Sequence, residues 1–298
     1  MPAALAGLLW RGRRSARALA DGVAARLTIG ADGIVEGAGP ISRDANTGRA
    51  VLLLHGFGDT PQTLHYVADA LHAAGYSVRA PLLPGHGRTL AEFGATHAKQ
   101  WISAARDAYA ELSATFGPSP VVGLSMGGAL GILLAAETPT MPALALVAPY
   151  VSIPRRARMV ARFHPLWELV TPYFRSGGER SIHDPVERVA ARGYGVLTPR
   201  LLFELSRVVR RVQVSLPRVR VPTLVIHGMN DERIPPDAAA REYARLGAAE
   251  KQLVWVDQGG HVLTVDYGRD RVIGLISDWL ARHPADARTP APGTAVPR

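Results

Sequence analysis

The chain has 298 residues, of which 47% are hydrophobic and 20% are charged. This composition excludes global disorder. The length allows one large α/β domain with an insertion, or two small domains. The absence of cysteine excludes disulfides, a thiolate nucleophile and cysteine-ligated metals, and no apolar run approaches the ~20 residues of a transmembrane helix. The net charge of +9 comes from 34 Lys and Arg against 25 Asp and Glu, and this excess is almost all arginine and spread along the chain, which argues against nucleic-acid binding.

Residues 1–30 stand apart from the rest of the chain. A short apolar group is followed directly by a basic group: Leu5, Leu8, Leu9 and Trp10, then Arg11, Arg13, Arg14 and Arg17. A secretory signal carries its positive charge before the apolar stretch, so the reversed order predicts a cytoplasmic protein whose first helix packs on the main domain. The alternative is a peripheral contact with the inner membrane, in which Trp10 and the leucines enter lipid and the arginines bind headgroups.

The middle of the chain alternates between predicted strands and helices. The continuous apolar run 50–55 predicts a strand buried on both faces, and apolar residues at helical spacing predict a helix over 63–74. Further strands are predicted over 77–80, 120–123, 144–148, 223–227 and 252–256, and further helices around 101–112 and over 126–137, 237–246 and 269–280. This alternation predicts a doubly wound, mostly parallel α/β sheet.

One segment, 150–217, interrupts this alternation. It contains no strand-like apolar run, and prolines and glycines divide it into short amphipathic helical pieces. We therefore expect an α/β core formed by 31–149 and 218–284, with 150–217 as a helical cap over one edge of the sheet. The final stretch, 285–298, is rich in Pro, Ala and Gly and is predicted to be a disordered tail.

A candidate nucleophile lies in the sequence Gly123-Leu-Ser-Met-Gly127, which fits the pattern G-x-S-x-G. A predicted strand runs into Gly123 and a predicted helix leaves from Met126. A sharp strand-to-helix turn of this kind strains the central serine and projects its hydroxyl from the carboxyl end of the sheet, and the glycines avoid collisions with neighbouring backbone. A serine hydroxyl is a poor nucleophile by itself, so Ser125 requires a base.

The base and its supporting acid are expected to follow in the order Ser, acid, His, each on a loop after a strand. Asp231 follows the strand over 223–227, and His261 follows the strand over 252–256. Glu232 would face away from the site in an extended loop, and Asp257 favours turn formation. His227 ends a strand and favours a packed position. No H-x-x-x-H pair or carboxylate cluster indicates a metal site.

Acyl transfer also requires donors for the oxyanion. The backbone N–H that follows the nucleophile belongs to Met126, and the loop His55-Gly-Phe-Gly58 offers the N–H of Phe57 as a second donor after the strongest predicted strand.

Five motifs in order resemble the bacterial carboxylesterase and monoacylglycerol lipase family of α/β-hydrolases over roughly residues 35–283. They are His55–Gly58 with Thr60-Pro61, Leu83–Gly87, Gly123–Gly128, Asp231 before Arg233–Pro236, and Gly260–Asp266. The resemblance implies Ser125 as nucleophile, His261 as base, Asp231 as orienting acid, and Phe57 and Met126 as oxyanion donors. It also implies structural support from His86 and Trp101.

The expected function is that of a serine hydrolase that cleaves carboxylic esters of apolar acyl chains through an acyl-enzyme intermediate, without a cofactor. The apolar cap predicts an acyl pocket, with four candidate substrate-binding residues: Met159, Phe163, Trp167 and Glu187. The alternatives are a thioesterase, lysophospholipase or amidase on the same triad, or an inactive hydrolase-fold protein used for binding. The intact set of Ser, Asp and His argues against the last. The oligomeric state is not predicted.

Overall fold

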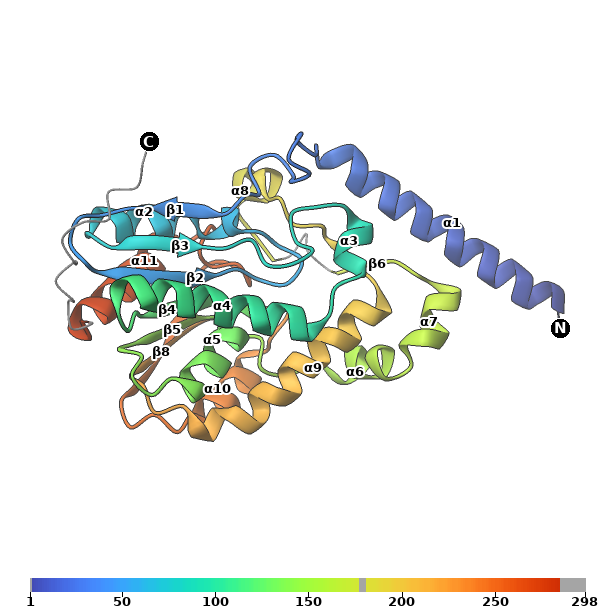
Figure 1. Cartoon of the computed structure of the whole chain (residues 1–298). Coiled ribbons are helices and arrows are strands. Elements are labelled where there is room, and N and C mark those ends of the chain that lie inside the picture. Colours follow the sequence, from blue (N-terminus) through green and yellow to red (C-terminus); the bar gives the residue numbers. More distant parts are fainter. Residues whose placement is uncertain (1, 177–180, 285–298) are drawn as a thin grey trace.

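The computed structural model describes residues 2–176 and 181–284, so the predicted disordered tail, 285–298, lies outside the described residues. Within the described ranges, seven strands form one sheet in the order β1-β3-β2-β4-β5-β8-β9 (Figure 1). Their bounds are Ile41–Arg43 for β1, Ala50–Leu54 for β2, Ser77–Ala80 for β3, Val121–Leu124 for β4, Leu144–Val147 for β5, Thr223–Gly228 for β8 and Lys251–Val256 for β9. All neighbouring strands are parallel except β1 and β3. The predicted doubly wound, mostly parallel sheet is confirmed.

Helices cover both faces of this sheet. One face packs on α4 (Ala98–Phe116) and α5 (Met126–Glu137), with α9 (Pro199–Ser215) packed against these two helices, and the other on α2 (His65–Ala73) and α11 (Arg269–Arg282). The remaining elements of the core are η1 (Pro61–Leu64), α3 (Leu90–Gly94), η3 (Leu216–Arg218) and α10 (Pro236–Arg245).

Strand β2 shows why a strand between two helical layers has no polar side. Leu52 and Leu54 pack in the core cluster with α4 and α5, whereas Val51 and Leu53 pack in the cluster with α2 and α11. All four side chains are fully buried. Successive side chains of a strand point to opposite faces, so burial of both faces requires a continuous apolar run.

The cap lies between β5 and β8 in the chain. It consists of α6 (Arg155–Arg162), α7 (His164–Val170), β6 (Phe174–Arg175), α8 (Pro185–Ala190), β7 (Val196–Leu197) and α9. Figure 1 shows α6, α7 and β6 beyond the carboxyl ends of the core strands. Ligands of open α/β sheets bind at these strand ends, so the cap stands over the expected position of the site.

The sequence patterns did not predict two kinds of strand. The edge strand β1 carries the exposed residues Ser42 and Arg43, so it shows no apolar run. In the cap, β6 and β7 form a two-residue antiparallel ladder, a feature that the predicted helical cap over 150–217 did not include. A pair of residues is too short to show a strand period.

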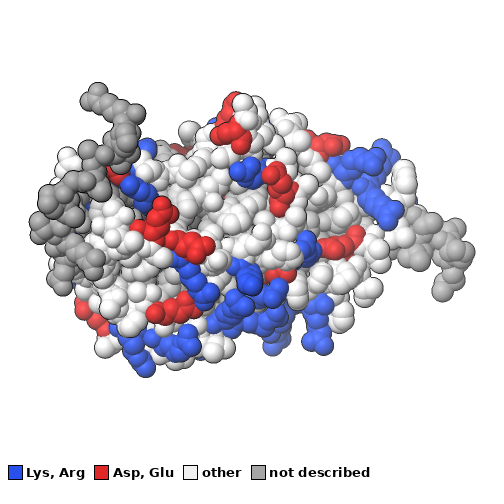
Figure 2. Space-filling model, viewed as in Figure 1, with Lys and Arg blue, Asp and Glu red and all other residues white. Residues whose placement is uncertain are grey.

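The N-terminal helix α1 (Pro2–Arg26) lies at the same end of the molecule as the cap. Ala16 and Val23 are buried against the body, whereas Trp10 is 61% exposed. Figure 1 shows the first turns of α1 extending away from the sheet, and Figure 2 shows basic side chains gathered over α1 and over α9. In the described part of the chain, no helix combines the length and the apolar character needed to span a bilayer.

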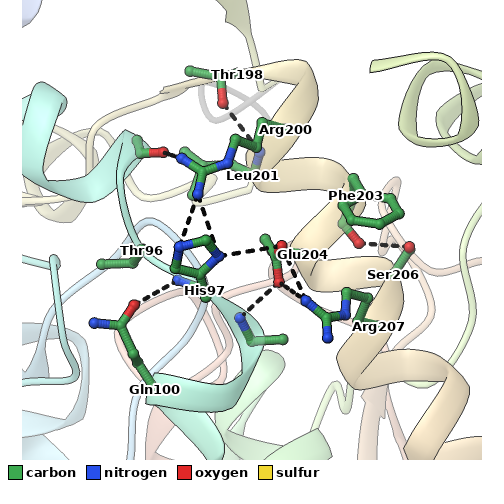
Figure 3. Close-up of polar contacts among 12 residues, drawn as sticks. Thr96, His97, Gln100, Thr198, Arg200, Leu201, Phe203, Glu204, Ser206 and Arg207 are labelled. Atoms are coloured by element: carbon green, nitrogen blue, oxygen red, sulfur yellow. Dashed lines mark hydrogen bonds and ion pairs between the residues drawn. The ribbon is translucent and has the colours of Figure 1, made fainter. Parts of the chain in front are cut away.

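A polar cluster joins α9 of the cap to the start of α4 in the core (Figure 3). Glu204 in α9 is 3% exposed and accepts a hydrogen bond of 3.0 Å from the backbone N–H of Ala98. Its carboxylate also lies 3.1 Å from Arg207 and 3.4 Å from the ring of His97. Arg200 donates to the Gly94 carbonyl at 3.1 Å, and its guanidinium lies 2.9 Å from Nε2 of His97. The cluster therefore holds the cap helix on the core.

The pKa of Glu204 reflects this environment. Burial raises the pKa, but the Ala98 N–H and the charge of Arg207 outweigh burial and hold it below its usual value. A lowered pKa in the folded state means that the ionised carboxylate stabilises the fold above the unfolded-state pKa of about 4.3. That contribution is lost as the pH falls through the folded-state pKa.

We expect Glu204→Gln to lower the free energy of unfolding at pH 7 by about 2 kcal/mol, because hydrogen bonds to a buried charged acceptor are lost. Urea denaturation from pH 7 to pH 3 measures this, and the difference from wild type should shrink below about pH 4. The exposed Glu111→Gln in α4 is the control and should match wild type throughout. A difference that is the same at every pH would contradict this role.

Candidate active site

Ser125 lies in the tight turn between β4 and α5. Its φ of 53° is in the left-handed region, which residues other than glycine rarely adopt. A Cβ on Gly127 would lie 1.9 Å from the carbonyl oxygen of Leu54 in β2, and one on Gly123 would lie 2.4 Å from the carbonyl oxygen of Gly127. The first turn of α5 therefore packs directly on strand backbone, and this contact holds Ser125 at the carboxyl end of the sheet.

Three side chains from three loops meet at this end. The Nε2 atom of His261 lies 2.7 Å from Ser125 Oγ, and its Nδ1 atom lies 2.7 Å from Asp231 Oδ2. His261 and Asp231 are each only 4% exposed. The other carboxylate oxygen of Asp231 accepts hydrogen bonds from the backbone N–H groups of Arg233, at 2.8 Å, and Ile234, at 3.0 Å. A proton held on Nδ1 leaves Nε2 free to accept the serine proton.

The electrostatics keep Asp231 ionised. Burial by itself raises the pKa of Asp231, but the charge and hydrogen bond of His261 and the N–H of Ile234 outweigh burial and hold the pKa below its usual value. The two rival carboxylates, Glu232 and Asp257, are both exposed. The structure therefore brings Asp231, and not its neighbours, to the imidazole.

A second histidine, His227, also lies beside this carboxylate. Its side chain is fully buried, and its Nε2 atom lies 3.5 Å from Asp231 Oδ2 and 2.8 Å from the carbonyl oxygen of Ile234. Burial lowers the pKa of His227, which favours the neutral ring and a hydrogen bond donated to Ile234. The sequence predicted its packed position at the end of β8, but no sequence pattern indicated its contact with Asp231.

The predicted oxyanion donors belong to the two segments next to Ser125. Met126 is the first residue of α5, where a backbone N–H has no acceptor within the helix. The loop after β2 also passes close to Ser125, since a Cβ on Gly56 would lie 3.5 Å from Ser125 Cβ. His55 supports this loop: its Nε2 accepts from the Leu83 N–H at 3.0 Å, and its Nδ1 lies 2.9 Å from the Gly56 carbonyl.

Aromatic packing holds Phe57 in the same loop. The rings of His86 and Trp101 lie edge-on to Phe57, with centroids 6.3 and 5.5 Å away. Trp101 also donates its indole N–H to the Pro84 carbonyl at 3.1 Å. Burial holds the pKa of His86 well below its usual value, so the ring is neutral. Both side chains therefore lie where they support the loop.

Ser125 and His261 open into a cavity of about 690 Å³, within the usual range for small-molecule sites. Most of its lining side chains are apolar and come from the cap, the core and α1: Leu19, Val23, Phe57, Phe93, Leu124, Ala157, Phe174, Ile182, Val196, Leu197, Leu202, Leu205 and Val262. Polar and charged side chains also line it: Arg26, Asp59, Tyr150, Arg175, Ser176, Ser181, Arg188, Tyr194 and Arg233. The cavity can therefore take an apolar chain with a polar group beside the serine.

The four cap residues predicted to bind substrate are not among the described residues that line this cavity. Met159, Phe163 and Trp167 are 55%, 41% and 42% exposed. Glu187 is buried, but it accepts a hydrogen bond of 2.7 Å from the Tyr66 hydroxyl. The structure corrects this prediction: short amphipathic helices do not reveal in their sequence which face is turned toward the site.

Asp266 is a positioning residue that sequence reasoning missed. It is fully buried, and each of its carboxylate oxygens accepts two backbone N–H groups. Oδ2 accepts from His183 at 2.8 Å and Gly260 at 2.6 Å, and Oδ1 accepts from Asp184 and Tyr267, both at 2.8 Å. It therefore ties the His261 loop to the cap. Its place at the end of the motif that begins at Gly260 was the available signal.

Among the described residues, no group of three His, Asp or Glu side chains is placed to hold a metal ion. The sheet, the strained serine turn and the hydrogen-bonded Ser, His and Asp define the α/β-hydrolase class.

The chain belongs to the serine aminopeptidase S33 family, which matches residues 45–267. This match, together with lipase and esterase relatives, confirms the predicted family relationship.

Three relatives illustrate the relationship. The chain is 28% identical to a thermostable monoacylglycerol lipase from Bacillus sp. (strain H-257), over 84% of this chain and 97% of the relative. It is 26% identical to a carboxylesterase from Bacillus subtilis (strain 168), over 78% of this chain and 93% of the relative. A solved structure from a study of LipS and LipT, two metagenome-derived lipolytic enzymes, is 27% identical, covers 83% of this chain and 98% of its own, and superposes with a TM-score of 0.77.

We expect Asp266→Asn to lower the free energy of unfolding by about 2–3 kcal/mol. Whichever way the asparagine is turned, its amide NH₂ faces two N–H donors that now lack an acceptor. Chemical denaturation measures the change, with the exposed Asp270→Asn in α11 as a control that should resemble wild type. Equal stability of the two variants would show that Asp266 does not hold the His261 loop.

Proposed function

We propose that Ser125, His261 and Asp231 are the catalytic triad of this carboxylic-ester hydrolase, and that its substrates are esters of apolar acyl chains. The observation that carries the proposal is the chain of two 2.7 Å contacts, from Asp231 through His261 to Ser125, at the wall of a largely apolar cavity.

The reaction follows from this geometry. His261 Nε2 takes the serine proton as Ser125 Oγ attacks the ester carbonyl, and the ionised Asp231 stabilises the imidazolium that forms. The N–H groups of Met126 and Phe57 donate to the developing oxyanion, each contributing about 3 kcal/mol in the transition state. His261 then protonates the departing alcohol. A water molecule, deprotonated by the same imidazole, releases the acid from Ser125.

The cavity supports the substrate class. Its apolar lining favours an alkyl or alkenyl chain, and the polar groups of Tyr150, Ser181 and Arg233 offer hydrogen bonds to a polar substituent on the alcohol. The names of the relatives, a monoacylglycerol lipase and a carboxylesterase, agree with such a substrate. We therefore propose monoacylglycerols and related simple esters as substrates.

A fluorophosphonate probe tests the nucleophile. We expect the wild-type enzyme to be labelled and Ser125→Ala to remain unlabelled, because the probe forms a covalent bond with an activated serine hydroxyl. A panel of p-nitrophenyl esters, monoacylglycerols, thioesters, lysophospholipids and amides then ranks the substrates by kcat/KM. Higher kcat/KM for thioesters, lysolipids or amides than for esters would favour the alternative chemistries on the same triad.

The choice of carboxylate has its own test. We expect Asp231→Asn to fold but to lose about 10⁴-fold in kcat, since an amide cannot stabilise the imidazolium or hold the required tautomer. The adjacent Glu232→Gln is the matched control and should stay within a few-fold of wild type. The reverse result in ester hydrolysis assays would identify Glu232 as the acid.

We also propose that residues 1–30 contact an anionic lipid surface. Trp10 is exposed at the projecting end of α1, and four neighbouring arginines are exposed as well: Arg11, Arg13, Arg14 and Arg17. The adjacent helix α7 exposes Leu166 and Leu169, at 64% and 55%. Aromatic and aliphatic groups beside arginines suit the interface of a bilayer that carries negative headgroups.

Vesicle co-sedimentation tests this contact. We expect the protein to bind vesicles that contain phosphatidylglycerol, and Trp10→Ser together with Arg13→Gln and Arg14→Gln to weaken binding at least tenfold, because both the apolar and the electrostatic attraction are reduced. Val214→Ser together with Arg220→Gln, on the opposite part of the molecule, is the control. Binding that is equal for all three proteins would rule out residues 1–30 as the contact.

A further inference from the structure

Helix α1 lies outside the part of the chain that matches the family, residues 45–267, yet it forms part of the cavity wall. Five of its residues line the cavity, spaced so that they share one helix face: Ala18, Leu19, Gly22, Val23 and Arg26. The cavity that contains Ser125 is thus closed on one side by an element that the family relationship does not supply.

Two contacts hold α1 in this position. At its carboxyl end, Arg26 donates hydrogen bonds to the carbonyl oxygens of Ala191, at 3.1 Å, Tyr194, at 3.2 Å, and Gly193. The N–H of Tyr194 donates in turn to the Gly58 carbonyl at 2.9 Å. The end of α1 is therefore joined through one short cap loop to the loop that carries Phe57.

The second contact is a backbone crossing with α7. A Cβ on Gly12 would lie 1.6 Å from the carbonyl oxygen of Val170. Only glycine permits this approach, so packing explains why residue 12 is a glycine. Held at Gly12 and at Arg26, the intervening part of α1 has a defined place over the cavity.

Gly22 differs from Gly12 in its surroundings. It lines the cavity and is exposed, and a Cβ added there would meet no atom within 4 Å. A glycine inside a helix costs about 1 kcal/mol relative to alanine, and no neighbouring atom requires it at this position. Its missing side chain leaves open space on the helix face that also carries Leu19 and Val23.

We propose that α1 is one wall of the acyl-chain site and that Gly22 is a specificity-determining residue whose missing side chain leaves room for long acyl chains. This inference rests on the proposed ester hydrolysis at Ser125. The acyl chain, and not the alcohol, is the group expected there, because Ala18, Leu19 and Val23 are apolar and the donors of Arg26 are engaged by backbone carbonyls. A larger side chain at position 22 would occupy the space that the chain needs.

The test is the acyl-length profile of full-length Gly22→Leu, measured with p-nitrophenyl esters from two to sixteen carbons. Gly7→Leu is the matched control, since Gly7 lies on the same helix, is exposed like Gly22, has no atom within 4 Å of a Cβ added there, and does not line the cavity. We expect Gly22→Leu to keep wild-type kcat/KM for acetate and butyrate esters and to lose at least tenfold for chains of twelve carbons or more. Gly7→Leu should follow wild type at every length.

Gly22→Ala adds a smaller side chain, and we expect it to lower kcat/KM less and only for the longest acyl chains. It replaces the leucine variant in the test if that variant does not fold. Identical profiles for the Gly22 and Gly7 variants would overturn the proposal, as would an equal loss at all chain lengths. A wild-type enzyme active on butyrate but inactive on every longer ester would overturn it too. If the wild type cleaves no ester of any length, the proposed function fails instead.

Discussion

The position of the Ser125 hydroxyl depends on one close backbone contact, between the first turn of α5 and strand β2. A side chain at Gly127 would overlap the Leu54 carbonyl, so the helix can begin against the strand only with glycine at that position. The strained backbone of Ser125 follows from this packing. The buried strands and helices around the turn supply the apolar contacts that keep such strain from relaxing.

The other two members of the proposed triad lie on loops whose shapes are set by buried carboxylates. Asp231 binds the N–H groups of its own loop with one oxygen and faces His261 with the other. Asp266 accepts hydrogen bonds from N–H groups of the His261 loop, and also from the cap N–H groups of His183 and Asp184. Because the same carboxylate holds both segments, the position of the imidazole and that of the cap are linked.

The cap and α1 together decide the shape of the cavity. The cap is held to the core by the Glu204 cluster and to the His261 loop by Asp266, and α1 is held to the cap at Gly12 and Arg26. The apolar residues that these elements turn inward line the cavity, while Trp10 and three apolar residues of α7, Leu166, Trp167 and Leu169, remain exposed. One helix, α1, therefore joins the outer surface to the wall of the proposed acyl site.

The sequence alone determined the fold class, the family and the three residues that meet at the site. These depend on local rules: apolar runs for strands buried on both faces, glycines around a serine at a sharp turn, and an acid and a histidine that follow successive strands. The tertiary structure decided what depends on the orientation of surfaces. The periodicity of a short amphipathic helix shows that it has an apolar face but not which element that face meets, so Met159, Phe163 and Trp167 were expected in a pocket that Phe174, Leu202 and Leu205 line. The contacts of Asp266, His227 and α1 join residues far apart in the chain, and only the packed structure brings them together.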